Sequence, residues 1–316
     1  MKKLTCIFMI FSLLLTLVSC SNETEKVAHP KETKFQTPVV FEHKGQEFKI
    51  HTYYQEFEDF LESAKKQPEK VDELYRQSVV EAFRVVHGYS YINHWMFTPP
   101  TDIKALEKSM DALVDKQERI NELIAEALKE SAEQLPGGNK SVYVMPAIPE
   151  MKEFLKVMSY VSGEVWNKNT IIILIDPEFL EEHLKYTVAH EYHHGVALEQ
   201  AGVYSVLDRS VMEGKADAFA KMIYPNVEVP WIEPLAGPAK EQAWKLFMEN
   251  RDSTDLELWY EFFNGNPAKG LPQWSNYKIG YQIMESFQKE NPDVSLEEWT
   301  KLPGEEILLM SKYKDE

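Results

Sequence analysis

Apolar side chains recur every three or four residues over much of the chain, and this spacing predicts amphipathic helices. The longest such run lies between Pro99-Pro100 and Pro136-Gly137-Gly138, and Thr101 is a suitable N-cap for one long helix there. Shorter runs predict a helix around Phe57 to Leu61 and a second from Val71 to Val86. An apolar stripe of this kind usually packs against a neighbouring helix. These runs therefore predict a mainly helical N-terminal lobe with no chemistry of its own.

A different pattern, alternation of apolar and polar residues, predicts strands. It occurs as a hairpin from Val39 to Thr52 around Lys44-Gly45, and again at Ser141–Met145, Tyr160–Trp166 and Thr170–Ile175. The last two strands are close enough in sequence to form a second hairpin. If Tyr160–Trp166 lies at the edge of the sheet, beside the helix that follows this hairpin, it could pair with an extended peptide segment. The alternative is a hairpin that only supports the helix.

Helices are predicted again after the second hairpin. Asp176-Pro177 is a good start for the helix that contains His190, and Gly202 would end it. A second helix is expected from about Leu207 to Ile223. Further helices are predicted at 239–250, 256–263, 276–288 and 305–312, with a Ser295-x-x-Glu298 capping box between the last two. The tryptophans of this region are expected in the core: Trp231, Trp244, Trp259, Trp274 and Trp299.

The residues His190-Glu191-Tyr192-His193-His194 have the pattern H-E-x-x-H. On a helix, His190 and His194 lie on one face, so both rings can bind a single Zn²⁺. Glu191 lies beside that face, where its carboxylate could take a proton from the attacking water. The pattern predicts two zinc ligands and a general base.

A third ligand from downstream must be a carboxylate, because no histidine follows His194 and no thiol remains there. Glu213 and Asp217, four residues apart, offer a ligand and an acceptor that could orient His190 through its other ring nitrogen. Gly214 and Ala216 would let another helix approach closely, which argues against a merely solvated acidic face. If Glu213 is not the ligand, Asp208 and Glu199 are the next candidates.

The N-terminus has the features of an export signal. Two lysines precede an apolar run from Ile7 to Val18 that is too short to span a bilayer. The run ends at Leu17-Val18-Ser19-Cys20, which resembles the lipobox of bacterial lipoproteins, in which the cysteine is lipidated and becomes the first residue after cleavage. The resemblance implies a signal peptide at 1–19 and lipidation of Cys20; an uncleaved anchor is the alternative. Residues 20–38 are predicted to be a flexible tether.

The acidic composition limits the partners of the chain. A formal net charge of −17 argues against nucleic acid as a partner, and against a basic patch as the means of membrane binding. We therefore expect an extracytoplasmic protein attached to the bacterial cell membrane by its lipid.

Three motifs resemble, in order and spacing, those of a bacterial domain-of-unknown-function family whose members are thought to be Zn-dependent proteases, within the gluzincin-like metallopeptidases typified by thermolysin. They are HEYHH at 190–194, EGKAD at 213–217 and YKIGY at 277–281. The resemblance covers roughly residues 140–312 and implies a thermolysin-type metal site. It implies an α+β, zincin-like catalytic domain at 139–316, after the helical lobe at 39–138. Thermolysin-like enzymes stabilise the oxyanion with a downstream histidine, which this chain lacks, so Tyr277 or Tyr281 would have to serve.

Together, these features predict a zinc metallopeptidase that hydrolyses bonds in a peptide or protein substrate with Glu191 as base. The alternative is a non-catalytic zinc-binding or scaffolding lipoprotein that keeps the fold. Glu191 favours an enzyme, because a purely structural site needs no base. A core in which these histidines bind no metal is disfavoured by the cost of burying polar groups without partners.

Overall fold

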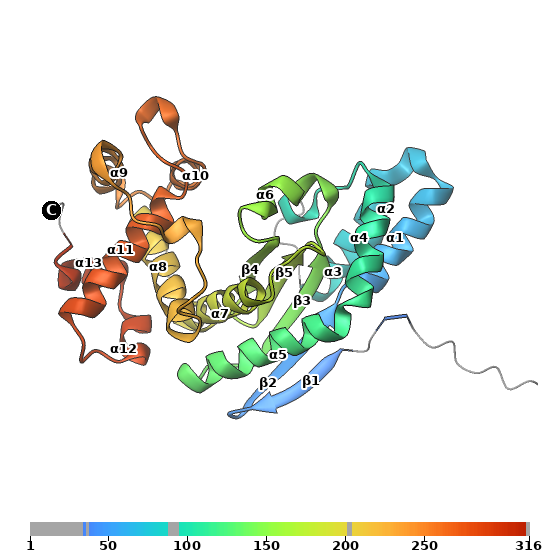
Figure 1. Ribbon diagram of the computed structural model, residues 1–316, viewed down its shortest axis with the longest axis horizontal. Helices are drawn as coiled ribbons and strands as arrows, with labels where there is room; N and C mark the ends of the chain where they lie inside the picture. Colours follow the sequence, from blue (N-terminus) through green and yellow to red (C-terminus); the bar gives the residue numbers. More distant parts are fainter. Residues whose placement is uncertain (1–33, 36–37, 88–94, 201–203, 314–316) are drawn as a thin grey trace, which may run out of the picture. The chain divides into compact units, whose positions relative to one another are not determined.

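Five strands form one mixed sheet in the order β1-β2-β3-β5-β4 (Figure 1). The computed structural model describes residues 34–35, 38–87, 95–200 and 204–313; the predicted signal peptide and Cys20 lie outside these ranges. The strands are β1 (Val39–His43), β2 (Gln46–Thr52), β3 (Lys140–Pro146), β4 (Val161–Asn167) and β5 (Thr170–Ile175). β3 is parallel to β2 and β5, and the two hairpin pairs are antiparallel. The fold class is α+β, as predicted.

Both predicted hairpins are present. Lys44 and Gly45 have φ values of 50° and 75°, which suit the tight turn between β1 and β2. Every residue of β5 is buried, as expected for an Ile-rich strand with neighbours on both sides. The sheet takes strands from both sides of residue 138, so residues 39–138 and 139–316 share one sheet and one hydrophobic core.

The helices of the N-terminal part are α1 (Tyr54–Lys66), α2 (Val71–Tyr75), a π-helix (Arg76–Val80), α3 (Glu81–His87), α4 (Ile103–Asp115) and α5 (Gln117–Gln134). The prediction of one long helix was wrong at two points. Asp102, not Thr101, caps α4, because its side chain accepts the backbone N–H of Ala105. The helix also breaks at Lys116, where α4 packs on α1 and α5 turns to pack on α7. Tertiary packing overrides the continuous apolar spacing here.

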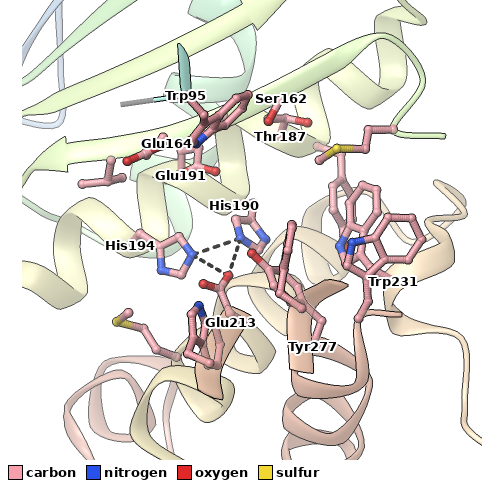
Figure 2. A pocket seen from close by; sticks show the side chains of 18 of the residues that line it. Trp95, Ser162, Glu164, Thr187, His190, Glu191, His194, Glu213, Trp231 and Tyr277 are labelled. Atoms are coloured by element: carbon pink, nitrogen blue, oxygen red, sulfur yellow. Dashed lines mark hydrogen bonds and ion pairs between the residues drawn. The ribbon is translucent and has the colours of Figure 1, made fainter. Parts of the chain in front are cut away.

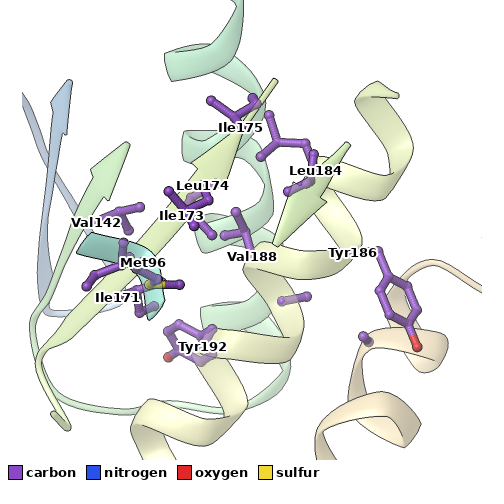
Figure 3. Packing of buried hydrophobic residues seen from close by; sticks show 14 of the residues in the cluster. Met96, Val142, Ile171, Ile173, Leu174, Ile175, Leu184, Tyr186, Val188 and Tyr192 are labelled. Atoms are coloured by element: carbon purple, nitrogen blue, oxygen red, sulfur yellow. The ribbon is translucent and has the colours of Figure 1, made fainter. Parts of the chain in front are cut away.

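Two helices form the centre of the remaining chain, α7 (Glu181–Ala197) and α8 (Val206–Ile223). The apolar side of α7, including Leu184 and Val188, packs on the isoleucines of β5 (Figure 3). The predicted start of α7 was wrong: Leu180 is its N-cap, and the Asp176 carboxylate instead accepts the Glu178 N–H in a separate turn. The predicted end at Gly202 lies outside the described residues.

The other helices are α6 (Lys152–Lys156), α9 (Gly237–Asn250), α10 (Leu256–Asn264), α11 (Ser275–Glu290), α12 (Leu296–Lys301) and α13 (Gly304–Ser311). Short 3-10 turns occur at Pro68–Lys70, Trp95–Phe97, Pro149–Met151, Leu198–Gln200, Pro230–Ile232 and Pro267–Lys269. The predicted capping box of Ser295 and Glu298 is present. Within the described ranges, none of the helices has the length and apolarity needed to cross a membrane.

α8 and α11 cross at very close range because glycines meet at the contact. A Cβ added to Gly214 would lie 2.2 Å from the carbonyl oxygen of Gly280, and one added to Gly280 would lie 1.8 Å from that of Ser210. The small-residue surface predicted beside Glu213 is therefore where α11 approaches. Tyr277, one turn before Gly280 on α11, is positioned by this crossing.

We expect Gly280→Ala to lower the free energy of unfolding by about 2–3 kcal/mol, since the added methyl group forces two backbones apart. Urea denaturation followed by circular dichroism measures the loss. Lys289→Ala, an exposed change on the same helix, is the control and should stay within about 0.5 kcal/mol of wild type. Equal stability of the Gly280 variant and wild type would contradict the tight crossing.

Candidate metal centre

Helix α7 places His190 and His194 on one face, as their spacing requires. The two rings are 4.6 Å apart between centroids, and their Nε2 atoms are 3.0 Å apart. Both side chains are about nine-tenths buried, in a cavity below the edge strand β4. Two ring nitrogens at this separation, with no apolar atom between them, form one side of a metal-binding site.

Helix α8 supplies the third group. The Glu213 Oε2 atom lies 3.0 Å from His194 Nε2 and 3.3 Å from His190 Nε2 (Figure 2). Among the described residues, these three side chains form the cluster of ligand types that could hold a metal ion. The structure thus brings together the three residues that the sequence predicted as ligands.

The donor set and its spacing fit Zn²⁺. A tetrahedral zinc with bonds of about 2.0–2.1 Å keeps its ligand atoms roughly 3.3 Å apart. The three separations between the Nε2 and Oε2 atoms are 3.0, 3.0 and 3.3 Å, close to that value. Two imidazoles and one carboxylate would hold Zn²⁺ through three protein ligands, a number typical of catalytic zinc sites, whereas structural sites usually have four.

The carboxylate of Asp217 contacts His190 through Nδ1, the ring nitrogen that does not face the cluster. Its Oδ1 atom accepts a hydrogen bond from His190 Nδ1 at 3.1 Å, which fixes the ring so that Nε2 faces the other ligands. The same oxygen accepts the Tyr186 hydroxyl at 2.8 Å and the Trp231 indole N–H at 3.1 Å. Asp217 is fully buried. The sequence predicted the first of these three donors and missed Tyr186 and Trp231.

Glu191 is buried beside the cluster, on the side of the sheet edge. Burial raises the pKa of its carboxyl to about 7, against the opposing effect of His190 and His194. Gly163 of β4 makes room for it: a Cβ at that position would lie 2.4 Å from Glu191 Cγ and 2.7 Å from Oε1. The glycine in the edge strand therefore lets the Glu191 carboxylate lie directly under β4.

Of the two candidate tyrosines, the structure places Tyr277 in the cavity. Burial, together with the charge of nearby Glu213, holds the pKa of its hydroxyl well above the usual range. Tyr281 is half-buried and is not among the residues that line the cavity.

The two other carboxylates that the sequence suggested as a possible third ligand, Glu199 and Asp208, make different contacts. Glu199 accepts from the buried Lys140 Nζ at 2.8 Å, and Asp208 closes the capping box of α8. His193 points away from the cluster into the core, where its ring stacks on Trp299 at 5.4 Å and its Nε2 lies 3.3 Å from the Thr300 hydroxyl.

The cavity above the cluster has a volume of about 310 Å³ and mostly aromatic walls. On one side it is bounded by β4, through Ser162, Gly163, Glu164 and Val165. On the other sides its aromatic residues are Trp95, Phe154, Tyr186, Trp231, Trp259, Tyr260, Phe263, Trp274 and Tyr277. Of the tryptophans predicted for the core, Trp231, Trp244, Trp274 and Trp299 are buried and Trp259 is half-buried. Trp231, Trp259 and Trp274 also line the cavity. Trp95 was missed, because the lobe that contains it was predicted to have no chemistry.

A family model described as "Predicted Zn-dependent protease (DUF2268)" matches residues 120–309, more than half of the chain. The match includes every member of the cluster and both tyrosines. No curated protein and no solved structure matches the chain.

We expect protein purified without chelator to contain about one zinc ion per chain, measured by atomic emission. Glu213→Ala should weaken zinc binding sharply because a ligand is lost, and Asp217→Ala should weaken it about 10–100-fold because His190 is no longer held. Glu182→Ala, an exposed change on α7, is the control. Full zinc occupancy in Glu213→Ala would refute its assignment as a ligand.

Proposed function

The chain belongs to the DUF2268 family of predicted Zn-dependent proteases, and from this premise we propose that it is a zinc metallopeptidase with Glu191 as general base. The observation that carries the proposal is the position of Glu191, buried beside the His190, His194 and Glu213 cluster in a cavity bounded by a sheet edge. A carboxylate so placed is not needed to hold a metal. It is placed where a water molecule bound in the cavity could give up a proton.

When bound by His190, His194 and Glu213, Zn²⁺ acidifies water and polarises a carbonyl group. Glu191 accepts the proton of the attacking water and then delivers it to the leaving amine. Gly163, which has no side chain, leaves the space under β4 that the Glu191 carboxylate occupies. Tyr277 donates its hydroxyl to the carbonyl oxygen as negative charge develops there.

The sheet edge supports a peptide as the substrate. β4 is the last strand of the sheet, with β5 on one side and, within the described ranges, no strand on the other. The outer side of an edge strand can pair with an extended segment, and Ser162 to Val165 of β4 face the cavity. A peptide bound along β4 would bring its backbone over Glu191 and the metal ligands.

The alternative is a zinc-binding scaffold that keeps the fold without catalysis. It does not explain why a carboxylate is present at Glu191. Burying a carboxyl group is costly, and a site that only binds zinc would be more stable with an apolar residue there. The strand glycine that makes room for this carboxylate would also have no role in a scaffold. Peptide cleavage by the zinc-loaded protein decides between the two.

The proposal includes a location outside the cytoplasm, with the chain anchored through a lipid on Cys20. Its support is the sequence of residues 1–38: a short apolar signal, the lipobox and a polar tether. Cys20→Ala should abolish labelling with a radioactive fatty acid and leave the protein unprocessed or released from the membrane fraction. Unchanged labelling of the variant would refute the lipobox.

Glu191→Gln keeps the shape of the side chain and the three ligands but removes the proton acceptor. We expect turnover to fall by about 10²–10⁴-fold with zinc content unchanged. The measurement is cleavage of a broad peptide library by wild type and variant, each checked for zinc. Wild type that is fully loaded with zinc but cleaves none of the library would favour the scaffold.

Tyr277→Phe removes only a hydroxyl group from the cavity. If that hydroxyl stabilises the oxyanion, kcat should fall roughly 10²–10³-fold, again with zinc content unchanged. Tyr281→Phe is the matched control, since it makes the same change one turn further along α11 and outside the cavity. A silent Tyr277→Phe with a damaging Tyr281→Phe would assign the role to the other tyrosine.

A further inference from the structure

One carboxylate oxygen joins the metal site to the wall of the cavity. Asp217 Oδ1 accepts His190 Nδ1, and it also accepts the indole N–H of Trp231, each at 3.1 Å. Asp217 has no exposed surface, so its charge depends on donors from the protein. Within the described ranges its second oxygen, Oδ2, has no hydrogen-bond partner. The position of this carboxylate, and hence of the His190 ring, is set by the donors on Oδ1.

Trp231 is held by aromatic neighbours and by the turn that contains it. Its ring packs edge-on against Tyr186 and Trp274, at centroid distances of 6.5 and 6.2 Å. The turn that contains it is fixed to α11, because Lys278 Nζ donates to the carbonyl oxygens of Pro230 at 2.7 Å and Glu233 at 3.1 Å. The indole therefore reaches Asp217 from a rigid support.

The same indole is a wall of the cavity beside His190 and Tyr277 (Figure 2). A substrate side chain that fills the aromatic part of the cavity packs against Trp231. Any displacement of the indole changes its hydrogen bond to Asp217 Oδ1, and through that oxygen the bond that orients His190.

We propose that Trp231 is a positioning residue that couples the wall of the substrate cavity to the metal ligand His190 through Asp217. The proposal rests on the proposed metallopeptidase function, because it takes the cavity as the substrate site and His190 as a ligand. It adds that metal affinity depends on Trp231, which is not a metal ligand, and that Trp231 acts through the Oδ1 atom of Asp217.

The test compares Trp231→Phe with Trp274→Phe. Both changes keep an aromatic wall, but only the first removes a donor from Asp217. Zinc dissociation constants are measured by competition with a chromophoric chelator, and the visible absorption spectrum of the Co²⁺-loaded protein reports the ligand field. Thermal unfolding of the metal-free variants shows whether each one folds.

We expect Trp231→Phe to weaken zinc binding about 3–10-fold, less than the 10–100-fold typical of losing the carboxylate itself, and to shift the Co²⁺ spectrum. Trp274→Phe should leave both within about twofold of wild type. In an Asp217→Ala background, which lacks the accepting oxygen, Trp231→Phe should cause no further loss, because its effect passes through that oxygen.

The possible results distinguish the proposed metallopeptidase function from the proposed coupling through Trp231. Wild type that binds no zinc overturns the proposed function and the coupling with it. Zinc binding by wild type with an unchanged affinity and Co²⁺ spectrum in Trp231→Phe overturns the coupling alone. Equal losses in the two tryptophan variants also overturn the coupling, and so does a full additional loss in the Asp217→Ala background. Either result means that Trp231 only supports the fold.

Discussion

The attraction between the buried carboxylate of Glu213 and the buried imidazoles of His190 and His194 determines how helices α7 and α8 meet. Burial raises the pKa of Glu213, but His194 and His190 outweigh it and hold that pKa far below its usual range. Burial lowers the pKa of His190, yet Asp217 and Glu213 raise it well above the ordinary value. Opposite charges thus offset the cost of removing these groups from water, and only a close approach of α7 and α8 permits this. A metal ion bound by these side chains competes with the protons that they would otherwise share, so its affinity depends on pH.

That approach requires support from outside the two helices. α7 rests on β5 through an apolar face, which leaves its histidines directed toward α8. α11 closes the other side of α8, where Gly214 and Gly280 remove the side chains that would keep the backbones apart. A third glycine, Gly163, gives Glu191 its place under the sheet edge. Glycines at these contacts set how near Tyr277 and Glu191 come to the cluster, because backbone sterics, unlike side-chain rotamers, cannot be relaxed locally.

The sequence predicted those parts of the site that follow from periodicity. His190 and His194 are related by helical spacing, Glu213 follows from the absence of other ligand types, and Gly214 indicated a close neighbour. Trp231 gave no such signal, since its contact with Asp217 depends on how a Pro-rich turn folds back over α8. Tyr186 lies four residues before His190 on α7, and this spacing could have indicated that it shares the face that meets Asp217. The break at Lys116 was missed for a related reason: its local sequence favours a continuous helix, and only packing against two different partners bends the chain there. The local sequence pattern therefore determines which side chains each helix presents on a given face. Tertiary contacts determine which of those side chains meet.

The helices of the site also contain buried polar atoms that have no hydrogen-bond partner in the described part of the chain. His194 Nδ1, Asp217 Oδ2 and both side-chain polar atoms of Asn276 are buried, and within the described ranges none has a hydrogen-bond partner. Each such atom costs about 1–3 kcal/mol relative to a satisfied one. Apolar replacements would avoid this cost, but at His194 and Asp217 they would also remove a ligand and the group that orients another. Positions where local stability is lost in this way are expected where a sequence is constrained by chemistry as well as by folding. At His194 and Asp217 the cost is therefore tied to groups that could hold a metal or orient its ligand, which argues that the cluster is kept for what it binds and not for the stability it adds.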